Sequence, residues 1–484
     1  YQTMRAFLEK CIEAIYSKHG SSLGDLCIVL PNRRAGLFLK KHLANQIDQA
    51  VFMPEIFSIE DFVSHQSGLT ILDNLSLLFE LFEVHKNINT TEDQDLHQFS
   101  DWAFQALHDF NEIDEYLVDA ADLFSYLSDT KAIELWNPEK KSLTDFEKKY
   151  LLFFRSLEKY YILLRKRLEQ KKIAYQGAAY RYLAENIQKI QDNIGYKKIY
   201  FLGFNALTRS EEKFIGHLVQ TELAAIFWDS DHYYLDTRHH GFLHEAGTFL
   251  RSHFKNRIFS DAKWTFEHFK TAKEIQLSGV PQNIGQAKLC GEILKHELSE
   301  EQLSNTAVVL ADESLLIPLL NSIPREIREL NITMGFPLES VPLYTFFDKV
   351  FQLKRNALNL KDIRNVSSGQ YHLKDLLAIC RHPLLQNLSE KLFQLKQHEL
   401  NSKLFEFVKS GKVLLGHQEI LQHFSSGNGT FMHYLLKDWR NNAVLALDGI
   451  FSIIEKLRQA ISISGKKETL QVEYLYHFSL IFKR

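Results

Sequence analysis

Between Lys197 and Tyr234 the hydrophobic pattern changes from strand-like to helix-like and back. The apolar run Lys198–Leu202 is rich in β-branched and aromatic residues, and Gly203 is predicted to end it. Leu207–Val219 carries apolar residues at helical spacing, and Ala224–Trp228 is a second apolar run. This succession predicts a βαβ unit and therefore a parallel sheet covered by helices. Ligands bind beyond the carboxyl ends of such strands, which here carry Gly203-Phe204-Asn205 and Asp229-Ser230-Asp231-His232.

The first 67 residues predict more α/β structure. Pro31-Asn32 is expected to turn a buried strand into a helix, and Ser58 is expected to cap the next helix. Asp61 stands at the third helical position, as in an aspartate variant of the capping box. The predicted elements are helix Met4–Lys18, strand Asp25–Leu30, a helix from Arg33 to about Gln49 and a short strand Val51–Met53.

From about Leu69 to Gln191 helical periodicity dominates, and no strand is predicted. The α/β pattern resumes at Lys197. Residues 1–67 and 196–272 are therefore predicted to form one domain, which a helical insertion at 68–195 interrupts. The helices predicted for the insertion are Leu75–Val84, Leu96–Asp109, Ile113–Leu127, Leu143–Gln170 and Ala178–Gln191.

Residues 273–355 predict a second α/β domain, and residues 356–484 a second helical insertion. The predicted fold class is therefore α/β, with two parallel-sheet domains that each carry a large helical insertion. The predicted strands are Glu274–Leu277, Thr306–Leu310 and Leu330–Met334. The predicted helices are Gln282–Leu298, Leu315–Ile323, Leu343–Leu353, Leu373–Cys380, Leu388–Gln397 and Phe431–Ile463.

Composition narrows the class of protein. With 45% hydrophobic and 24% charged residues, the chain has the balance of a globular protein, and 484 residues exceed what one core holds. A net charge of −3 gives no overall attraction to a polyanion, so nucleic acid would need a local basic patch.

No apolar run is long enough for a membrane helix, and the first residues do not resemble a signal peptide. The helical pattern Leu470–Phe482 stops without a cap, as expected for a fragment. Four scattered cysteines predict reduced thiols in a cytoplasmic protein: Cys11, Cys27, Cys290 and Cys380.

Nucleotide hydrolysis has no sequence support here. A phosphate-binding loop needs glycines and a lysine at a helix N-terminus, and no Gly-x-x-x-x-Gly-Lys-Ser/Thr motif occurs. The glycine-rich stretch Ser426–Thr430 lacks the lysine and follows no predicted strand. An ATPase also places acidic residues at a strand end to hold magnesium, whereas Gly203-Phe204-Asn205 is neutral.

The residue spacing does not favour two other chemistries. An acidic and histidine cluster could hold a metal, but no His-x-x-x-His pair with a third ligand lies on a predicted helix. Nuclease sites use Glu-x-Lys on a strand, whereas the three such triplets here fall in predicted helices or loops. The cluster is Asp229, Asp231, His232, His239, His240 and His244; the triplets begin at Glu139, Glu147 and Glu211.

One short basic segment is a candidate for binding phosphate. Asn32, Arg33 and Arg34 stand where a predicted strand ends and a helix begins, and Lys40 and Lys41 follow in the same helix. Helix N-terminal N–H groups favour an anion. The alternative interpretation is an ordinary solvated helix face.

The order of α/β and helical segments resembles that of superfamily 1 helicases. Ile28–Ala35 resembles their motif Ia, and Thr306–Glu313 resembles the first core strand of the second helicase domain. Phe201–Glu212 resembles the "GF..lt..E" stretch at the Walker B position of AddB-like proteins, and Trp228–Tyr234 stands at the motif III position. The chain is similar to AddB-type proteins that contain "VLPNRRA" and "GFNAL" and carry a C-terminal PD-(D/E)XK nuclease domain.

This resemblance implies two RecA-like domains and an inactivated motor in double-strand-break processing and recombinational repair. It implies DNA, single- or double-stranded, near Asn32, Arg33 and Arg34, and a partner helicase subunit of the AddA/UvrD-like type. No catalytic or nucleotide-binding residue, cofactor or metal is expected in residues 1–484. The exonuclease domain, with its divalent metal, is expected beyond residue 484.

Two alternatives stay open on the sequence. The chain could be a protein-interaction scaffold of helicase-like fold with no nucleic-acid role. It could also be an ATPase whose phosphate loop precedes Tyr1, since helix Met4–Tyr16 has the position of a phosphate-loop helix.

Overall fold

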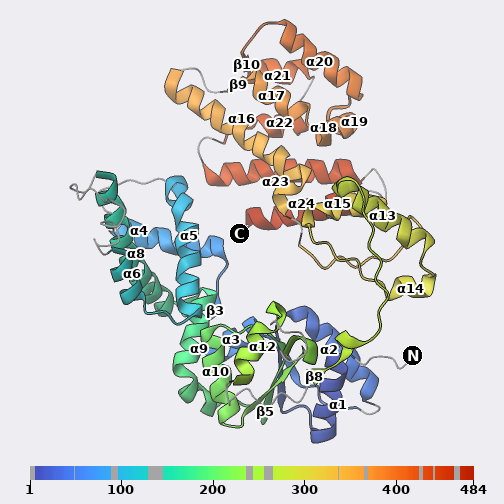
Figure 1. Cartoon of the computed structure of the whole chain (residues 1–484). Coiled ribbons are helices and arrows are strands. Elements are labelled where there is room, and N and C mark those ends of the chain that lie inside the picture. Colours follow the sequence, from blue (N-terminus) through green and yellow to red (C-terminus); the bar gives the residue numbers. More distant parts are fainter. Residues whose placement is uncertain are drawn as a thin grey trace, which may run out of the picture. The chain divides into compact units, whose positions relative to one another are not determined.

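The computed structural model describes residues 6–47, 50–88, 96–128, 145–235, 244–255, 265–335, 337–364, 369–424, 429–439, 442–462 and 469–483. The chain forms two compact units, Tyr1–Ile275 and Gln276–Arg484. It is an α/β protein that is mostly helical, with one four-stranded parallel sheet in the first unit (Figure 1). The finer division into the four predicted domains stays a prediction.

The sheet confirms the predicted βαβ unit. Its strands β2 (Glu55–Ser58), β1 (Leu26–Leu30), β5 (Lys198–Phe204) and β6 (Ala224–Trp228) lie side by side in this order, all parallel. In the register of the sheet, Ile28 of β1 is paired with a residue of β2 and one of β5. All five residues of β1 are buried, as expected for an inner strand that helices cover on both faces.

Alternate residues of each strand enter two separate cores. Ile28 and Leu30 of β1 pack on helices α1 (Phe7–His19) and α2 (Arg33–Gln46). Cys27 and Val29 face the opposite layer, which consists of α3 (Ile59–Ser67), α9 (Gln176–Ile190) and α10 (Arg209–Gln220). Because both faces are buried, the strands are continuous apolar runs in the sequence.

Two predictions about the strands are wrong in detail. Val51–Met53 is not a strand, because the segment that pairs with β1 begins at Glu55. Gly203 does not end β5, which continues to Phe204 through an irregularity in its pairing with β6. Gly203 has φ +74°, a conformation that glycine adopts readily.

A helical body lies in the chain between β2 and β5, as predicted, and has its own apolar core. Its helices are α4 (Asn74–Ile88), α5 (Leu96–Glu115), α6 (Ala120–Ser128) and α8 (Asp145–Gln170). The prediction that this segment has no strand is wrong: β3 (Thr70–Ile71) and β4 (Ile173–Ala174) form a short parallel pair. The helix break predicted after Asp109 instead follows Glu115.

A buried carboxylate ties this body to α9. Asp114 is fully buried and accepts hydrogen bonds from the hydroxyls of Tyr161 (2.6 Å) and Tyr175 (2.5 Å) and from Nη1 of Arg181 (3.0 Å). Burial, followed by the charge of Asp114, raises the pKa of Tyr161 to about 12. Because Arg181 belongs to α9, the network joins the insertion to a helix that also packs on the sheet.

The remaining elements of the first unit are short. Helix α12 (Thr248–Lys255) packs near the end of β6, and β7 (Ser230–Asp231) pairs with β8 (Thr265–Phe266). The others are α11 (His232–Leu235) and three single turns of 3₁₀ helix at Gln191–Asn193, Glu245–Gly247 and His268–Lys270.

The second unit begins with helices but without the predicted sheet. The described residues between 276 and 355 contain no strand, so the strand predictions for Thr306–Leu310 and Leu330–Met334 are wrong here. The strand predicted at Glu274–Leu277, which spans the boundary of the two units, is wrong as well. Several of their apolar side chains are exposed, and a cleft of about 1500 Å³ is lined by the segments 306–310 and 327–334. The helices are α13 (Gln282–His296), α14 (Glu300–Ser304), α15 (Leu316–Ser322) and α16 (Pro342–Arg364), with 3₁₀ turns at Glu313–Leu315 and Leu338–Ser340.

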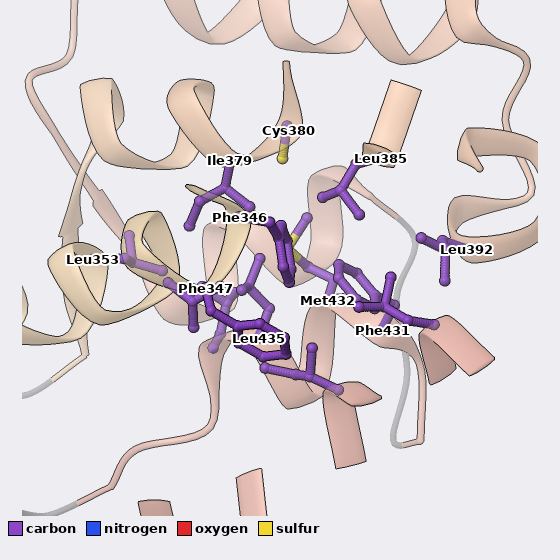
Figure 2. Close-up of a cluster of buried hydrophobic side chains, with 14 of the residues drawn as sticks. Phe346, Phe347, Leu353, Ile379, Cys380, Leu385, Leu392, Phe431, Met432 and Leu435 are labelled. Carbon is purple, nitrogen blue, oxygen red and sulfur yellow. The ribbon is translucent and has the colours of Figure 1, made fainter. Parts of the chain in front are cut away.

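A helical core occupies the rest of the second unit, as predicted. Figure 2 shows Phe346 of α16 among side chains from several helices, including Ile379 and Met432. Two short strands, β9 (Gln370–His372) and β10 (Leu414–Gly416), pair antiparallel. The helices are α17 (Leu373–Cys380), α18 (Pro383–Asn387), α19 (Ser389–Phe393), α20 (Gln397–Lys409), α21 (His417–His423), α22 (Phe431–Leu436), α23 (Ala443–Ser462) and α24 (Thr469–Lys483).

The long helix predicted over Phe431–Ile463 is wrong, because it is two helices, α22 and α23. Two side chains from elsewhere bind the carbonyl groups at the end of α22. The hydroxyl of Tyr371 donates to the carbonyl of Leu436 (2.6 Å), and Nζ of Lys354 donates to that of Lys437 (2.7 Å). These tertiary contacts satisfy carbonyls that a continuous helix would have used itself. The helix predicted over Leu388–Gln397 is also wrong, since α19 ends at Phe393.

Candidate functional site

The candidate site is the carboxyl edge of the parallel sheet. Because β1, β2, β5 and β6 run in the same direction, the residues that follow them meet at this edge. They include Ser58 at the end of β2, Pro31-Asn32 after β1, Asn205 after β5 and Asp229 after β6. The structure therefore brings together segments that are up to about 200 residues apart in the sequence.

The predicted basic segment begins helix α2 at this edge. Asn32 is the N-cap of α2, and its Oδ1 accepts a hydrogen bond from the backbone N–H of Ala35 (2.9 Å). This contact explains why the strand turns into a helix at Pro31-Asn32. The amide oxygen of Asn32 is therefore used for capping the helix.

Arg33 forms a bidentate ion pair with the first turn of α3. Its Nε and Nη2 donate to Asp61 at 2.9 Å and 2.6 Å, and the hydroxyl of Ser58 donates to the same carboxylate at 2.6 Å. The hydrogen bond from Arg33 is the main cause that lowers the pKa of Asp61, while partial burial opposes it. Ser58 caps α3 as predicted, accepting from the N–H of Asp61 (3.2 Å).

The sequence predicts Asp61 only as a capping residue, and no spacing indicates that it pairs with Arg33, 28 residues away. Arg34, next in α2, is exposed at the surface, as are Lys40 and Lys41. The basic segment therefore contains Arg33, which a carboxylate holds, and three further cations on exposed positions of the same helix, of which Arg34 also has an interaction partner.

The end of β5 is covered by an aromatic ring. A Cβ atom at Gly203 would lie 3.3 Å from the ring of Phe7 at the start of α1. The residues there are Gly203, Phe204 and Asn205, none of which carries a charge. In the α10 helix that follows, Thr208 and Glu211 form a capping box, and burial raises the pKa of the Glu211 carboxyl. Glu211 is therefore committed to the helix terminus.

A buried histidine completes the edge beside β6. The ring of His253 stacks on Trp228 with centroids 5.1 Å apart, and its Nε2–H donates to the carbonyl of Asn205 (3.1 Å). Its Nδ1 lies 3.6 Å from Glu212. Burial is the main cause that lowers the pKa of His253, so the neutral ring is favoured. Sequence reasoning missed this residue, because only the fold brings α12 against β5 and β6.

The acidic and histidine cluster after β6 is spread over short elements: Asp231 ends β7, His232 begins α11 and His244 precedes a 3₁₀ turn. Asp231 accepts hydrogen bonds from the N–H groups of Tyr233 (2.9 Å) and Phe269 (3.0 Å). Asp229 is exposed, and partial desolvation raises the pKa of its carboxyl. His239 and His240 lie outside the described residues. Among the residues that are described, no three His, Cys, Asp or Glu side chains are grouped to hold a metal ion.

The Glu-x-Lys triplets lie on helices where they are described. Glu147 belongs to α8 and Glu211 to α10, whereas the triplet at Glu139 lies outside the described residues.

Within the described part of the chain, no helix combines the length and hydrophobicity required to cross a membrane.

Comparison of the chain with protein-family models and with curated proteins gives no match. The function is therefore argued from the residues and geometry of the sheet edge.

Proposed function

We propose that this chain is a motor-dead, helicase-like DNA-binding region of an AddB-type helicase–nuclease that acts in double-strand-break processing and recombinational repair. In this proposal the first unit contains the first RecA-like domain, and residues 273–355 contain the first part of the second. A partner helicase subunit would drive movement along the DNA, and a separate nuclease domain would cut it with a divalent metal.

One observation carries the proposal. The segments that resemble motif Ia and the Walker B region contain the ends of β1 and β5, which are neighbours in the parallel sheet. Asn32, Arg33 and Arg34 thus stand beside Gly203 and Asn205 at the edge where parallel sheets bind ligands. A helical body between β2 and β5 agrees with the helicase-like order of segments.

The local chemistry favours DNA binding over nucleotide hydrolysis. The sequence lacks a phosphate-loop motif, and the end of β5 presents neutral residues against Phe7. ATP hydrolysis requires carboxylates and a phosphate cradle at such positions. Arginines at the N-terminus of a helix can instead contact a DNA phosphate without any base preference.

The ion pair with Asp61 limits what Arg33 can contribute. A phosphate that reaches Arg33 must compete with the carboxylate that already holds its Nε and Nη2. Both arginines lie on the exposed first turn of α2, so a phosphate can approach them from solvent. We therefore expect Arg33 to have its full effect on DNA affinity only when Asp61 is neutralised.

The test is the salt dependence of binding to a fluorescently labelled single-stranded oligonucleotide, measured by anisotropy. R33A/R34A should weaken binding and lower the slope of log K against log salt by about 0.7 for each phosphate that is no longer neutralised. Asp61→Asn, which releases Arg33, should strengthen binding. This gain should be absent from D61N/R33A, since it depends on the released arginine.

Lys374→Ala provides a matched control, because Lys374 is an exposed cation of the second unit. Its affinity and salt slope should equal those of the wild type. Binding that is independent of salt and of both arginines would contradict the proposal, and would favour an interaction scaffold without a nucleic-acid role.

A further inference from the structure

Helix α2 exposes two large apolar side chains next to each other. Leu37 is 68% exposed and Phe38 is 51% exposed, while Gly36, Leu39 and Leu43 on the opposite side of the helix are buried. At 3.6 residues per turn, Arg34 lies one turn before this apolar pair and Lys41 one turn after it. Arg34, Leu37, Phe38 and Lys41 thus form a continuous stripe on the outer face, which we call the α2 strip.

The charged side chains of this helix all have the same sign. Residues 33–46 contain two arginines and two lysines but no aspartate or glutamate, although the whole chain has a net charge of −3. Arg33 forms an ion pair with Asp61 of α3, and Arg34 also has an interaction partner. The α2 strip therefore combines an apolar centre with a cation at each end, which sets it apart from the mixed charge typical of a solvated face.

We propose that the α2 strip is a docking surface for an acidic amphipathic helix of a partner protein. Apolar residues of that helix would cover Leu37 and Phe38, and its carboxylates would lie against Arg34 and Lys41. Helices recognise such surfaces through apolar side chains at i, i+3, i+4 and i+7, and complementary charges select the partner.

A protein helix fits the strip better than nucleic acid does. Bases stack on aromatic faces, whereas Leu37, the more exposed of the pair, offers an aliphatic side chain. An aliphatic and an aromatic residue side by side are a usual centre for a protein contact. The strip shares Arg34 with the proposed DNA contact, but its apolar part lies farther along the helix.

The chain contains a second exposed apolar pair that serves as a control. Phe405 and Val408 are both exposed on α20, but Glu406 lies between them in the sequence, and Lys409 packs over the ring of Phe405. That surface therefore has an apolar pair next to both a carboxylate and an ammonium group. An acidic helix should therefore distinguish it from the α2 strip.

The probe is a synthetic helix-forming peptide with leucines at i, i+3, i+4 and i+7 and glutamates on both flanks of this stripe. Its binding to the whole chain is measured by fluorescence anisotropy. L37S/F38S should weaken binding about tenfold or more, because neither apolar anchor remains. F405S/V408S should bind like the wild type. A peptide with lysines in place of the glutamates should not bind, and added salt should weaken binding of the acidic peptide.

Three results would overturn the proposal: no binding of the acidic peptide, equal binding to wild type and L37S/F38S, or equal binding of the lysine peptide. A fourth is displacement of the peptide by a single-stranded oligonucleotide whose own affinity falls in L37S/F38S, which would make the strip a nucleic-acid surface. Since these residues are exposed, the variants should unfold at the wild-type urea concentration. Failure of this test leaves the DNA test with Arg33 and Arg34 unaffected.

Discussion

Two segments with similar sequences have different structures in the two units. Leu26–Leu30 and Thr306–Leu310 are both five-residue apolar runs with β-branched residues, and both are predicted as buried strands. The first is β1, in which every residue is buried between β2 and β5. The second pairs with no strand among the described residues, and its Val309 is 88% exposed.

The difference shows that an apolar run becomes a strand only where neighbouring backbones are available. β1 has parallel partners on both sides and a helical layer over each face. An isolated extended segment leaves its N–H and C=O groups to water and gains little burial. The same pattern of residues thus specifies a buried strand in one unit and an exposed segment in the other.

The largest expected contrast is in amide hydrogen exchange. Amides of β1 and β5 should exchange at least about 10³-fold more slowly than those of residues 306–310 and 330–334, since inner strands open only with most of the structure. Exchange followed by mass spectrometry measures both regions in one sample. Equal protection in the two regions would mean that the second unit also contains a hydrogen-bonded sheet in solution.

Matched leucine substitutions test the same contrast through stability. Leu202 in β5 is fully buried, whereas Leu277 is 93% exposed. Leu202→Ala should lower the free energy of unfolding by about 2–5 kcal/mol, because burial decreases and a cavity forms. Leu277→Ala should change it by less than about 0.5 kcal/mol. Urea unfolding measures both; a large decrease in Leu277→Ala would show that Glu274–Leu277 is a packed strand.

A smaller effect of pH should appear in the helical core of the second unit. Lys354 is buried on the carbonyl of Lys437 beside the rings of Tyr371 and Trp439. Burial lowers the pKa of its ammonium group to about 7, which Asp438 partly opposes. Between this value and about 10.4, the pKa of an unperturbed lysine, the unfolded chain binds more protons than the folded chain. The free energy of unfolding should therefore rise with pH in this range, by about 2 kcal/mol between pH 7 and 9.

The control for this effect is a pair of lysine substitutions. Lys354→Met should remove that part of the pH dependence of unfolding, whereas Lys374→Met, at an exposed position, should keep it. Because Lys354 lies in the helical core, exchange of residues 306–310 should not follow the same pH profile after correction for intrinsic rates. An unchanged pH dependence in Lys354→Met would show that the lysine reaches solvent.

Local signals in the sequence predict many elements of the first unit well. The second apolar run of the βαβ unit begins and ends at the same residues as β6, and the predicted cap at Ser58 is present. These features depend on neighbours within a few residues. The strand predicted at Val51–Met53 is wrong because pairing with β1, and not local propensity, decides which residues after α2 become β2.

The candidate site is predictable only in part. The position of Asn32 after an apolar run predicts that it starts a helix, and it does cap α2. The pairing of Arg33 with Asp61 and the stacking of His253 on Trp228 depend on contacts between separate elements. No spacing in the sequence indicates such contacts.

The sequence by itself determined the βαβ unit of the first unit, the neutral end of β5 and the lack of a phosphate-loop motif, because these follow from residue type and short-range periodicity. Only the tertiary structure decided the strand order β2-β1-β5-β6, the carboxylate that holds Arg33, and which apolar runs form strands. Strand pairing and ion pairs between elements join residues far apart in the chain. Their free energy therefore depends on which neighbours the whole fold brings into reach.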